Sequence, residues 1–293
     1  MMLGESRPFG KLLLGATKVA IASPTGLACA YIGLRPIYPN HCVVAPVRCV
    51  PLLSDLSDEE FDSLFECVRD VQALFGRDAS AHNIAVADGA AAGQPTLLPH
   101  AHVHVVPRRQ GDLTNNDEIY DRIGEWSPDG APTVPPPFYV PSDAERKPRT
   151  AEMMADEANR YATLGASSTV STDRIARIPV GGAPLPAEKF TFGRIALDPS
   201  QIFYASQLSV ATVNLKPLCP GHVLCIPRRN VPRLAELSDE ERRDLWRLVR
   251  EVMSIVKAAH GADGCKLGVQ DGKDAGQSVP HVHVHVLPHR SGA

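Results

Sequence analysis

The sequence predicts an α+β fold built from two related units, each an antiparallel sheet packed against one main helix. Three observations support this prediction. A set of motifs occurs twice in the same order, each copy contains one long amphipathic helical pattern, and each copy contains a strand-like run in which histidine alternates with other residues. The chain of 293 residues is long enough for two ordinary domains.

Composition and charge exclude several classes of protein. Thirty Lys and Arg against 33 Asp and Glu give a formal net charge of −3, so no overall basic field favours nucleic acid. The seven cysteines include no Cys-x-x-Cys pair, which argues against a disulfide framework and a structural zinc site. No apolar run approaches the roughly 20 residues of a membrane span, and no secretory signal pattern is visible. We therefore expect a cytoplasmic protein, with the nucleus as the alternative compartment, and neither nucleic acid nor membrane as a partner.

Motifs of the first copy return in the second after a nearly constant interval of 181 to 183 residues. The matched pairs are Phe9-Gly10 and Phe192-Gly193, Leu34-Arg35-Pro36 and Leu215-Lys216-Pro217, Ser57-Asp58-Glu59-Glu60 and Ser238-Asp239-Glu240-Glu241, and His102 and His283. Because order and spacing persist over a whole unit, the pattern indicates duplication.

In each copy, short apolar and β-branched runs precede the helical pattern. They span residues 27–32 and 42–47 in the first copy and 208–213 and 223–226 in the second. Each Ser-Asp-Glu-Glu motif then predicts a helix start, because a Glu three residues after Ser completes a capping box. The apolar residues at helical spacing are Phe61, Leu64, Phe65, Val68, Val71 and Phe75 in the first copy and Leu245, Val249, Val252, Met253 and Val256 in the second.

The segment between the copies has a different composition. Residues 127–142 are too rich in proline for a packed element and are expected to be extended. Residues 150–161 favour a helix, and residues 165–189 are expected to form a flexible connector rich in Gly, Ser and Thr. The predicted division of the chain is a first domain at 1–125, a proline-rich tail with helix and linker at 126–189, and a second domain at 190–293.

The histidine runs carry the clearest chemical signal. They contain His281, His283 and His285 in the second copy and His100, His102 and His104 in the first. Successive side chains of a strand point to opposite faces, so the three imidazoles of a run are expected on one face and the valines on the other, toward the core. The stretch before the second run, residues 270–280, adds a Gly-containing turn with amide and hydroxyl donors that would suit a phosphate.

Three interpretations of such a run compete. A satisfied polar core is disfavoured, because three buried imidazoles would need three sets of hydrogen-bond partners that a core strand rarely supplies. A metal site lacks a carboxylate or thiolate at matching spacing and leaves Gly276-Gln277-Ser278 unexplained. Nucleophilic attack on phosphorus is favoured, because with a reference pKa of about 6.5 a large fraction of imidazole is unprotonated at neutral pH. A neighbouring backbone carbonyl would fix the attacking tautomer through the other ring nitrogen.

Further motifs precede the second histidine run. They are Gln270-Asp271-Gly272, Gly276-Gln277-Ser278-Val279, Asn214-Leu215-Lys216-Pro217 and Pro220-Gly221-His222. Together with residues 281–288, these motifs resemble the histidine triad superfamily, and within it the fragile-histidine-triad branch. The resemblance covers nearly all of residues 190–293. It extends to the first copy, where residues 107–113 and 116–120 resemble the segment that follows the triad in that branch. Residues 152–158 resemble the C-terminal helix of the branch.

This resemblance implies hydrolysis of dinucleoside polyphosphates such as diadenosine triphosphate through a nucleotidyl-histidine intermediate. His283 would attack the α-phosphorus, His281 and His222 would support it, and His285 would contact phosphate. The residues that match substrate-binding positions of the branch are Asn214 for the ribose and Gln270, Gly276, Gln277, Ser278 and Val279 for phosphate, together with His285. Ile195 stands where the branch carries a ligand-contacting histidine, so recognition of the outer nucleotide differs here.

The first copy keeps a weaker version of this site. Its residues are His41, His100, His102, His104 and Gln94. Gly33 and Ala87 stand where the second copy has Asn214 and Gln270, and five residues rather than three separate the loop glutamine from the first histidine. Two lost side-chain contacts, at roughly 1.5 to 3 kcal/mol each, predict a weak or inactive first site with a bulged loop.

Single-domain members of the superfamily are two-fold dimers, so the fused pair resembles an intramolecular pseudo-dimer of two HIT-fold units, expected to be a monomer in solution. The expected ligand is an adenine dinucleotide or mononucleotide, with no tightly bound cofactor and with Mg²⁺ or Mn²⁺ arriving on the substrate. Three alternative functions stay open: a nucleoside phosphoramidate hydrolase, a nucleotidyltransferase, and a nucleotide-polyphosphate sensor with slow turnover. Transferases with two such units usually carry a His-Pro-His-Gly motif, which neither copy shows. Activity is expected to fall below about pH 6.

Overall fold

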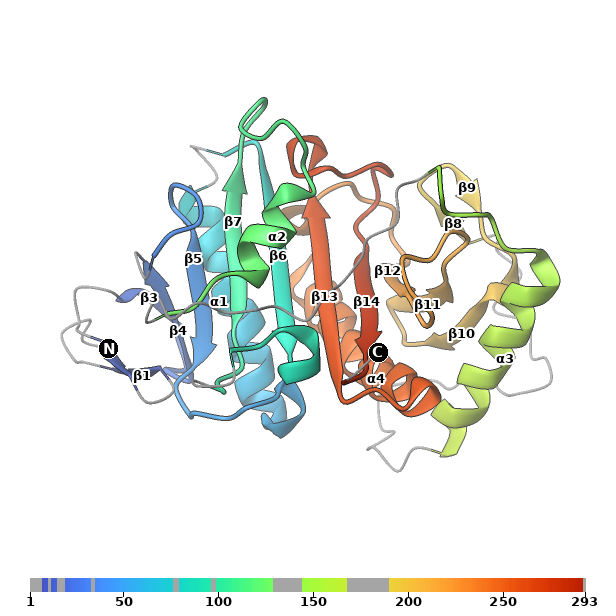
Figure 1. Ribbon diagram of the computed structural model, residues 1–293, viewed down its shortest axis with the longest axis horizontal. Helices are drawn as coiled ribbons and strands as arrows, with labels where there is room; N and C mark the ends of the chain where they lie inside the picture. The colour runs from blue at the N-terminus through green and yellow to red at the C-terminus, as the bar shows by residue number, and fades with distance from the viewer. Residues whose placement is uncertain are drawn as a thin grey trace. The chain divides into compact units, whose positions relative to one another are not determined.

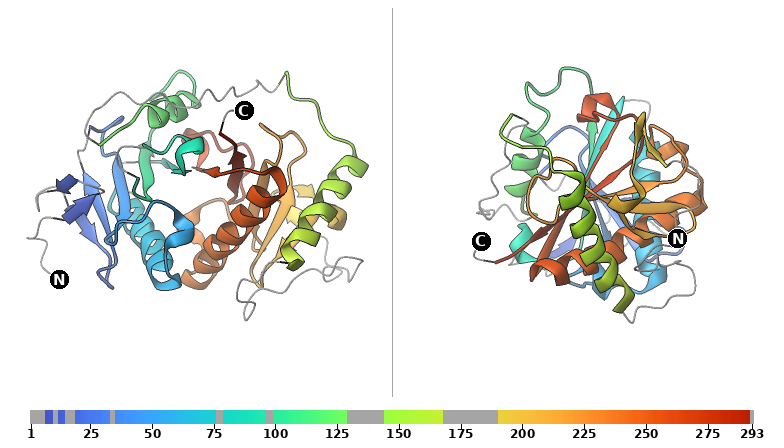
Figure 2. Two further views of the ribbon diagram at one scale, coloured as in Figure 1. Left: turned by 60° about the horizontal axis from the view of Figure 1, so that its bottom comes forward. Right: turned by 90° about the vertical axis from the view of Figure 1, so that its right-hand side faces the viewer.

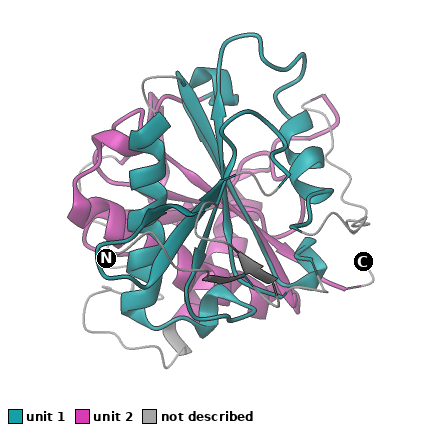
Figure 3. Ribbon diagram, turned by 90° about the vertical axis from the view of Figure 1, so that its left-hand side faces the viewer, with its two compact units in different colours: residues 1–136, 267–278 teal, residues 137–266, 279–293 magenta. Residues whose placement is uncertain are grey.

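The computed structural model (Figure 1) describes residues 7–9, 12–14, 19–32, 35–75, 79–95, 99–128, 144–167 and 190–291. The chain forms two compact units, coloured separately in Figure 3. The first unit comprises residues 1–136 and 267–278, and the second comprises 137–266 and 279–293. The boundaries of the units differ from those of the two sequence repeats. The helix that follows the first repeat belongs to the second unit, and residues 267–278 of the second repeat belong to the first unit. The domain boundaries at residues 125 and 189 stay predictions.

The first unit contains an antiparallel sheet with the order β6-β7-β5-β4-β3, and the end of β13 (Gly264–Asp271) continues it beside β6. Helix α1 (Asp58–Phe75) packs against β3, β4, β5 and β7. Helix α2 (Glu118–Gly124) lies on the opposite face, in front of β6 and β7 in Figure 1. The strands are β1 (Arg7–Phe9) and β2 (Leu12–Leu14), which pair with each other, β3 (Val19–Ala22), β4 (Ala28–Ile32), β5 (Cys42–Pro46), β6 (Ala81–Asp88) and β7 (Val103–Arg108).

The second unit contains an antiparallel sheet with the order β10-β11-β12-β14. Helix α4 (Asp239–His260) packs against β11, β12 and β14, and α3 (Ala151–Ser167) packs against α4 and β10, as Figure 2 shows from two sides. The strands are β8 (Thr191–Phe192) and β9 (Ile195–Ala196), which form a separate pair, β10 (Ile202–Ala205), β11 (Ser209–Val213), β12 (Val223–Pro227) and β14 (Val284–His289).

Capping boxes start both long helices where the sequence predicts them. The Ser238 hydroxyl accepts from the Glu241 N–H at 3.1 Å, and the Glu241 carboxylate accepts from the Ser238 N–H at 2.8 Å. Ser57 and Glu60 make the same pair of bonds at 3.2 and 2.9 Å. The predicted apolar faces of both helices are buried, apart from a half-buried Phe75. The α+β class, the two antiparallel units and the four predicted strand segments are therefore confirmed.

Two local predictions need correction. Strands β7 and β14 begin at Val103 and Val284, so only the last histidine of each run lies in a strand. The preceding residues leave the strand because their backbone bonds elsewhere: the Val282 N–H donates to the Val231 carbonyl at 2.8 Å. Helix α3 continues to Ser167, beyond the predicted end at 161. The predicted proline-rich extension and connector fall mostly on residues 129–143 and 168–189, outside the described residues.

All seven cysteines carry free thiols. No helix in the described part of the chain combines the length and the apolar character needed to cross a membrane.

We expect Ser238→Ala to lower the free energy of unfolding by about 1 kcal/mol, because the first turn of α4 loses a hydroxyl acceptor for the Glu241 N–H. Urea denaturation of the full chain measures this loss. Ser254→Ala is the matched control, since Ser254 is exposed in the middle of the same helix. Equal effects of the two substitutions would contradict the role assigned to the cap.

Candidate active site

In the second repeat, backbone groups fix the proton on His281. Its Nε2 lies 2.9 Å from the carbonyl oxygen of Pro227, and its Nδ1 lies 3.1 Å from the Gly193 N–H. A carbonyl oxygen can only accept and an amide N–H can only donate, so Nε2 carries the proton and Nδ1 does not.

The same reasoning defines the reactive nitrogen of His283. Its Nδ1 lies 2.8 Å from the carbonyl oxygen of His281, so the Nδ1 proton is donated to that carbonyl. In a neutral imidazole the other nitrogen then holds an unprotonated lone pair, which makes Nε2 of His283 the available nucleophile. The predicted bond from a ring nitrogen to a neighbouring backbone carbonyl is confirmed, and attack by the other nitrogen stays a prediction. Phe192 packs edge-on against this ring, with ring centroids 5.0 Å apart.

A relay of hydrogen bonds gives His285 the opposite tautomer. The Leu218 N–H donates to Nδ1 of His222 at 3.0 Å, so His222 carries its proton on Nε2. That proton is donated to Nδ1 of His285 at 2.9 Å. His285 therefore carries its own proton on Nε2, and this N–H is a donor in a ring whose centroid lies 4.9 Å from that of His283.

Burial keeps these imidazoles neutral. Desolvation lowers the pKa of His281 and of His283, and it lowers the pKa of His285 well below the ordinary value. The pKa of His222 falls to about 3, through burial first and then through the positive charge of Arg146. At neutral pH the site thus offers one basic nitrogen beside one N–H donor.

The first repeat reproduces this geometry closely. His100 Nε2 lies 3.0 Å from the Pro46 carbonyl oxygen, His102 Nδ1 lies 2.7 Å from the His100 carbonyl oxygen, and His41 Nε2 lies 3.0 Å from His104 Nδ1. Burial lowers the pKa of His102 to about 4 and that of His41 to about 3. The tautomers of the first triad therefore match those of the second.

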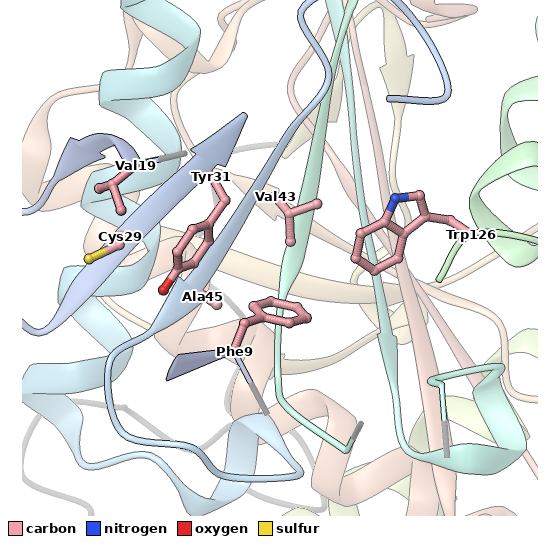
Figure 4. Packing of buried hydrophobic residues seen from close by; sticks show 7 residues of the cluster. All are labelled: Phe9, Val19, Cys29, Tyr31, Val43, Ala45 and Trp126. Carbon is pink, nitrogen blue, oxygen red and sulfur yellow. The ribbon is translucent and has the colours of Figure 1, made fainter. Parts of the chain in front are cut away.

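Trp126 distinguishes the first triad. This residue follows α2, is buried, and packs its indole against His41, His102 and His104 with ring centroids 6.2, 5.4 and 4.9 Å away. Figure 4 shows Trp126 and Phe9 side by side in the core cluster of the first unit. Nε2 of His102, the counterpart of Nε2 of His283, is buried and finds no hydrogen-bond partner among the described residues. The first triad is thus covered by aromatic side chains at the position where a ligand would meet His102.

The second triad is less enclosed. His285 is partly exposed, whereas His104 is 2% exposed. Asn214, the predicted ribose ligand, has its Nδ2 3.4 Å from Nε2 of His222, and Val279 packs against the cluster around Phe192. Ile195, which stands where the fragile-histidine-triad branch carries a histidine, is 53% exposed.

The predicted phosphate-binding turn lies in the first unit, whereas the histidines of the second repeat lie in the second unit. Within the turn, the Gly272 N–H donates to Oε1 of Gln277 at 3.1 Å, and Ser278 is exposed. The joint action of Gln270, Gly276, Gln277 and Ser278 with His283 therefore stays a prediction. In the first repeat the Gly89 N–H donates to Oε1 of Gln94 at 3.3 Å, so this part of the loop keeps the same shape. The predicted bulge and Gly33 fall on residues outside those described.

One sequence argument is wrong. A core was expected to lack partners for three imidazoles, yet His281 is fully buried and bonded at both ring nitrogens, and valines of the same run are buried as well. At His281 both faces of the run are enclosed, because a backbone carbonyl and a backbone amide from other segments supply the partners. What separates a polar core from a reactive site here is the one nitrogen that the backbone leaves unprotonated.

Sequence reasoning missed three contributors. They are the carbonyls of Pro46 and Pro227, the rings of Phe9 and Phe192, and Trp126. The first two sets could have been found from the repeat, since both occur at equivalent positions of the two copies. Nothing in the local sequence marks Trp126.

Comparison with known families decides the affiliation of the chain. The family model described as HIT domain matches residues 19–111 and again residues 197–292. The chain belongs to the HIT domain family. Its tandem HIT domains fit the predicted intramolecular pseudo-dimer.

Among curated relatives of this HIT protein, the bifunctional bis(5'-adenosyl)-triphosphatase/adenylylsulfatase FHIT of Arabidopsis thaliana is 48% identical over 35% of this chain and 57% of its own length. The asymmetrical bis(5'-nucleosyl)-tetraphosphatase of Schizosaccharomyces pombe is 53% identical over 31% of this chain and 50% of its own length. The chain thus spans about half the length of these relatives. A galt-like protein from Arabidopsis thaliana shares the fold alone, with a TM-score of 0.52 and 12% identity over 91% of this chain and 75% of its own.

We expect Trp126→Ala to raise the pKa of His102 from about 4 toward 6.5, because water then reaches the buried ring. A pH titration of the His102 ring proton by NMR measures the change. Trp246→Ala, in α4 of the second unit, is the control and should leave this pKa unchanged. An unaltered His102 pKa in Trp126→Ala would show that Trp126 does not keep water from the triad.

Proposed function

We propose that this HIT protein hydrolyses dinucleoside polyphosphates, such as diadenosine triphosphate, and that the second repeat carries the reaction. The single observation that carries the proposal is the fixed tautomer of His283, whose unprotonated Nε2 stands beside the N–H donor of His285. A relative named bis(5'-adenosyl)-triphosphatase, from Dictyostelium discoideum, supports the substrate class at 46% identity over 66% of its own length.

In the proposed first step, Nε2 of His283 attacks the α-phosphorus and forms an N–P bond, while the bond from phosphorus to the bridging oxygen breaks and the outer nucleotide leaves. His285 donates its Nε2–H to a phosphoryl oxygen and so stabilises the charge in the transition state. In the second step water attacks phosphorus and forms a P–O bond, the electron pair of the breaking N–P bond returns to Nε2 of His283, and the nucleoside monophosphate leaves while the proton lost by the water passes to solvent. The Nδ1–H bond to the His281 carbonyl persists throughout and holds the ring in place.

Cationic side chains favour an anionic ligand here. The Arg146 guanidinium donates to the Lys216 carbonyl at 3.0 Å, and Arg149 donates to the Asn214 carbonyl at 2.9 Å. The positive charge of Arg146 also lowers the pKa of His222 and His285. A bound phosphate would be attracted to the side of the triad that faces Arg146 and Arg149.

We propose Asn214 as the ribose ligand and Gln270, Gly276, Gln277, Ser278 and Val279 as phosphate ligands, with an adenine nucleotide as the ligand. Any Mg²⁺ or Mn²⁺ would arrive on the substrate oxygens and not on a protein site. The first repeat is proposed to be weak or inactive, because Trp126 covers His41, His102 and His104. Hydrolysis of an adenosine phosphoramidate, measured beside diadenosine triphosphate with and without Mg²⁺, separates the alternative activities.

Paired substitutions test which repeat works. His283→Ala should lower kcat for diadenosine triphosphate by at least about a thousandfold, because the nucleophile is lost. His102→Ala should keep most of the activity, since the first triad is covered. Quenching the reaction with labelled substrate should place the label on His283. Retained activity in His283→Ala with loss in His102→Ala would reverse the assignment.

The pH dependence of kcat/KM tests the protonation state of His283. Burial lowers its pKa below 6.5, so the neutral nucleophile persists to lower pH than in a free imidazole. Activity should therefore stay level from pH 7 down to pH 6.5, the reference value for histidine, and fall only as the pH drops through the lowered pKa. Circular dichroism at each pH checks that the fold is retained. An acid limb centred at or above pH 6.5, the unperturbed value, would contradict this protonation state.

A further inference from the structure

The turn after β13 is held by side chains of the first repeat, all within the first unit. Nε2 of Gln72 donates to Oδ2 of Asp271 at 3.0 Å, and Nδ2 of Asn83 donates to the Ala275 carbonyl at 3.1 Å. The Ser80 hydroxyl also donates to the Asp274 carboxylate. Residues about 190 positions apart in the chain therefore meet at the turn that precedes the second triad.

Asn83 is oriented by a buried ion pair. Arg108 is fully buried and donates to both carboxylate oxygens of Asp112, at 2.9 and 2.7 Å, and to Oδ1 of Asn116 at 2.7 Å. Its Nη1 donates to Oδ1 of Asn83 at 2.6 Å. A guanidinium can only donate, so the oxygen of the Asn83 amide faces Arg108 and its NH₂ group faces the Ala275 carbonyl. The bond to the turn has one possible direction.

The turn is also sterically confined at Gly276. This glycine has φ +93°, and a Cβ there would lie 2.9 Å from Nε2 of Gln270 and 3.3 Å from Cβ of Asn116. A side chain would therefore be strained by its backbone conformation and crowded by its neighbours. Asn116 thus limits the space beside Gly276, while its amide oxygen accepts from Arg108.

We infer that Asn83 of the first repeat is a positioning residue for phosphate binding at the second repeat. The inference rests on the proposed function, in which Gly276, Gln277 and Ser278 bind the phosphate attacked by His283. Asn83 holds the carbonyl of Ala275, the residue before Gly276, and so fixes the backbone that presents these ligands. The first repeat, with its own triad covered, contributes to the reaction through this support.

The test uses the full chain with Asn83→Ala and with the isosteric Asn83→Asp, which keeps an acceptor for Arg108 but loses the donor to Ala275. Affinities for AMP and for adenosine are measured by calorimetry, and kcat/KM is measured with diadenosine triphosphate. Loss of one buried hydrogen bond predicts that AMP affinity and kcat/KM fall about tenfold to hundredfold, while adenosine affinity is unchanged because it lacks the phosphate. In a Gln277→Ala background the effect of Asn83→Ala on AMP affinity should shrink, since both act through one turn.

Ser63→Ala is the matched control. Ser63 is buried in α1 of the same unit, and its hydroxyl bonds to Ser23 at 2.8 Å rather than to the turn. This variant should lower stability without changing the ratio of AMP to adenosine affinity. Two outcomes would overturn the inference and leave the proposed function intact, provided that His283→Ala is inactive. One is an equal loss of AMP and adenosine binding in the Asn83 variants, and the other is no loss of either. Retained hydrolysis in His283→Ala would overturn both.

Discussion

The hydrogen bond from Nδ1 of the middle histidine to the carbonyl two residues earlier is the constraint on which the site depends. It is made at 2.8 Å in the second repeat and 2.7 Å in the first, and it allows only one tautomer of a neutral ring. The alternation of histidine with valine therefore does more than align imidazoles. It lets the backbone carbonyl of one histidine orient the next histidine ring. Burial lowers the pKa of each middle ring and keeps it neutral, and the hydrogen bond leaves that ring one basic nitrogen.

Two copies of one geometry have different surroundings. The carbonyls of Pro46 and Pro227, the rings of Phe9 and Phe192 and the paired outer histidines are equivalent in both. Within the part of the chain that the structure describes, only the first triad has an indole packed against it, and Nε2 of His102 is buried without a partner. A buried unbonded nitrogen costs stability, which the apolar contacts of Trp126 and Phe9 offset. His102 is therefore packed into the core of the first unit.

The exchange of segments between the compact units places a turn of the second repeat among residues of the first. Residues 267–278 lie in the first unit, where Gln72 and Asn83 donate hydrogen bonds to them. The Arg108 to Asp112 ion pair is buried, and its desolvation is compensated because the guanidinium also bonds to two asparagine oxygens. A polar network with fixed directions can specify the conformation of a turn more narrowly than apolar packing can.

The sequence by itself determined the duplication, the α+β class, the capped helices at Ser57 and Ser238, and the two runs of histidine, because these follow from local periodicity and side-chain type. Tertiary structure alone decided which nitrogen of His281 carries the proton, since the Pro227 carbonyl lies 54 residues away, and which triad is covered, since Trp126 reaches His102 from beyond α2. It also decided that Asn83 meets Ala275, 192 residues away. Contacts between residues so distant depend on how the sheets and helices pack, and no local pattern encodes that packing.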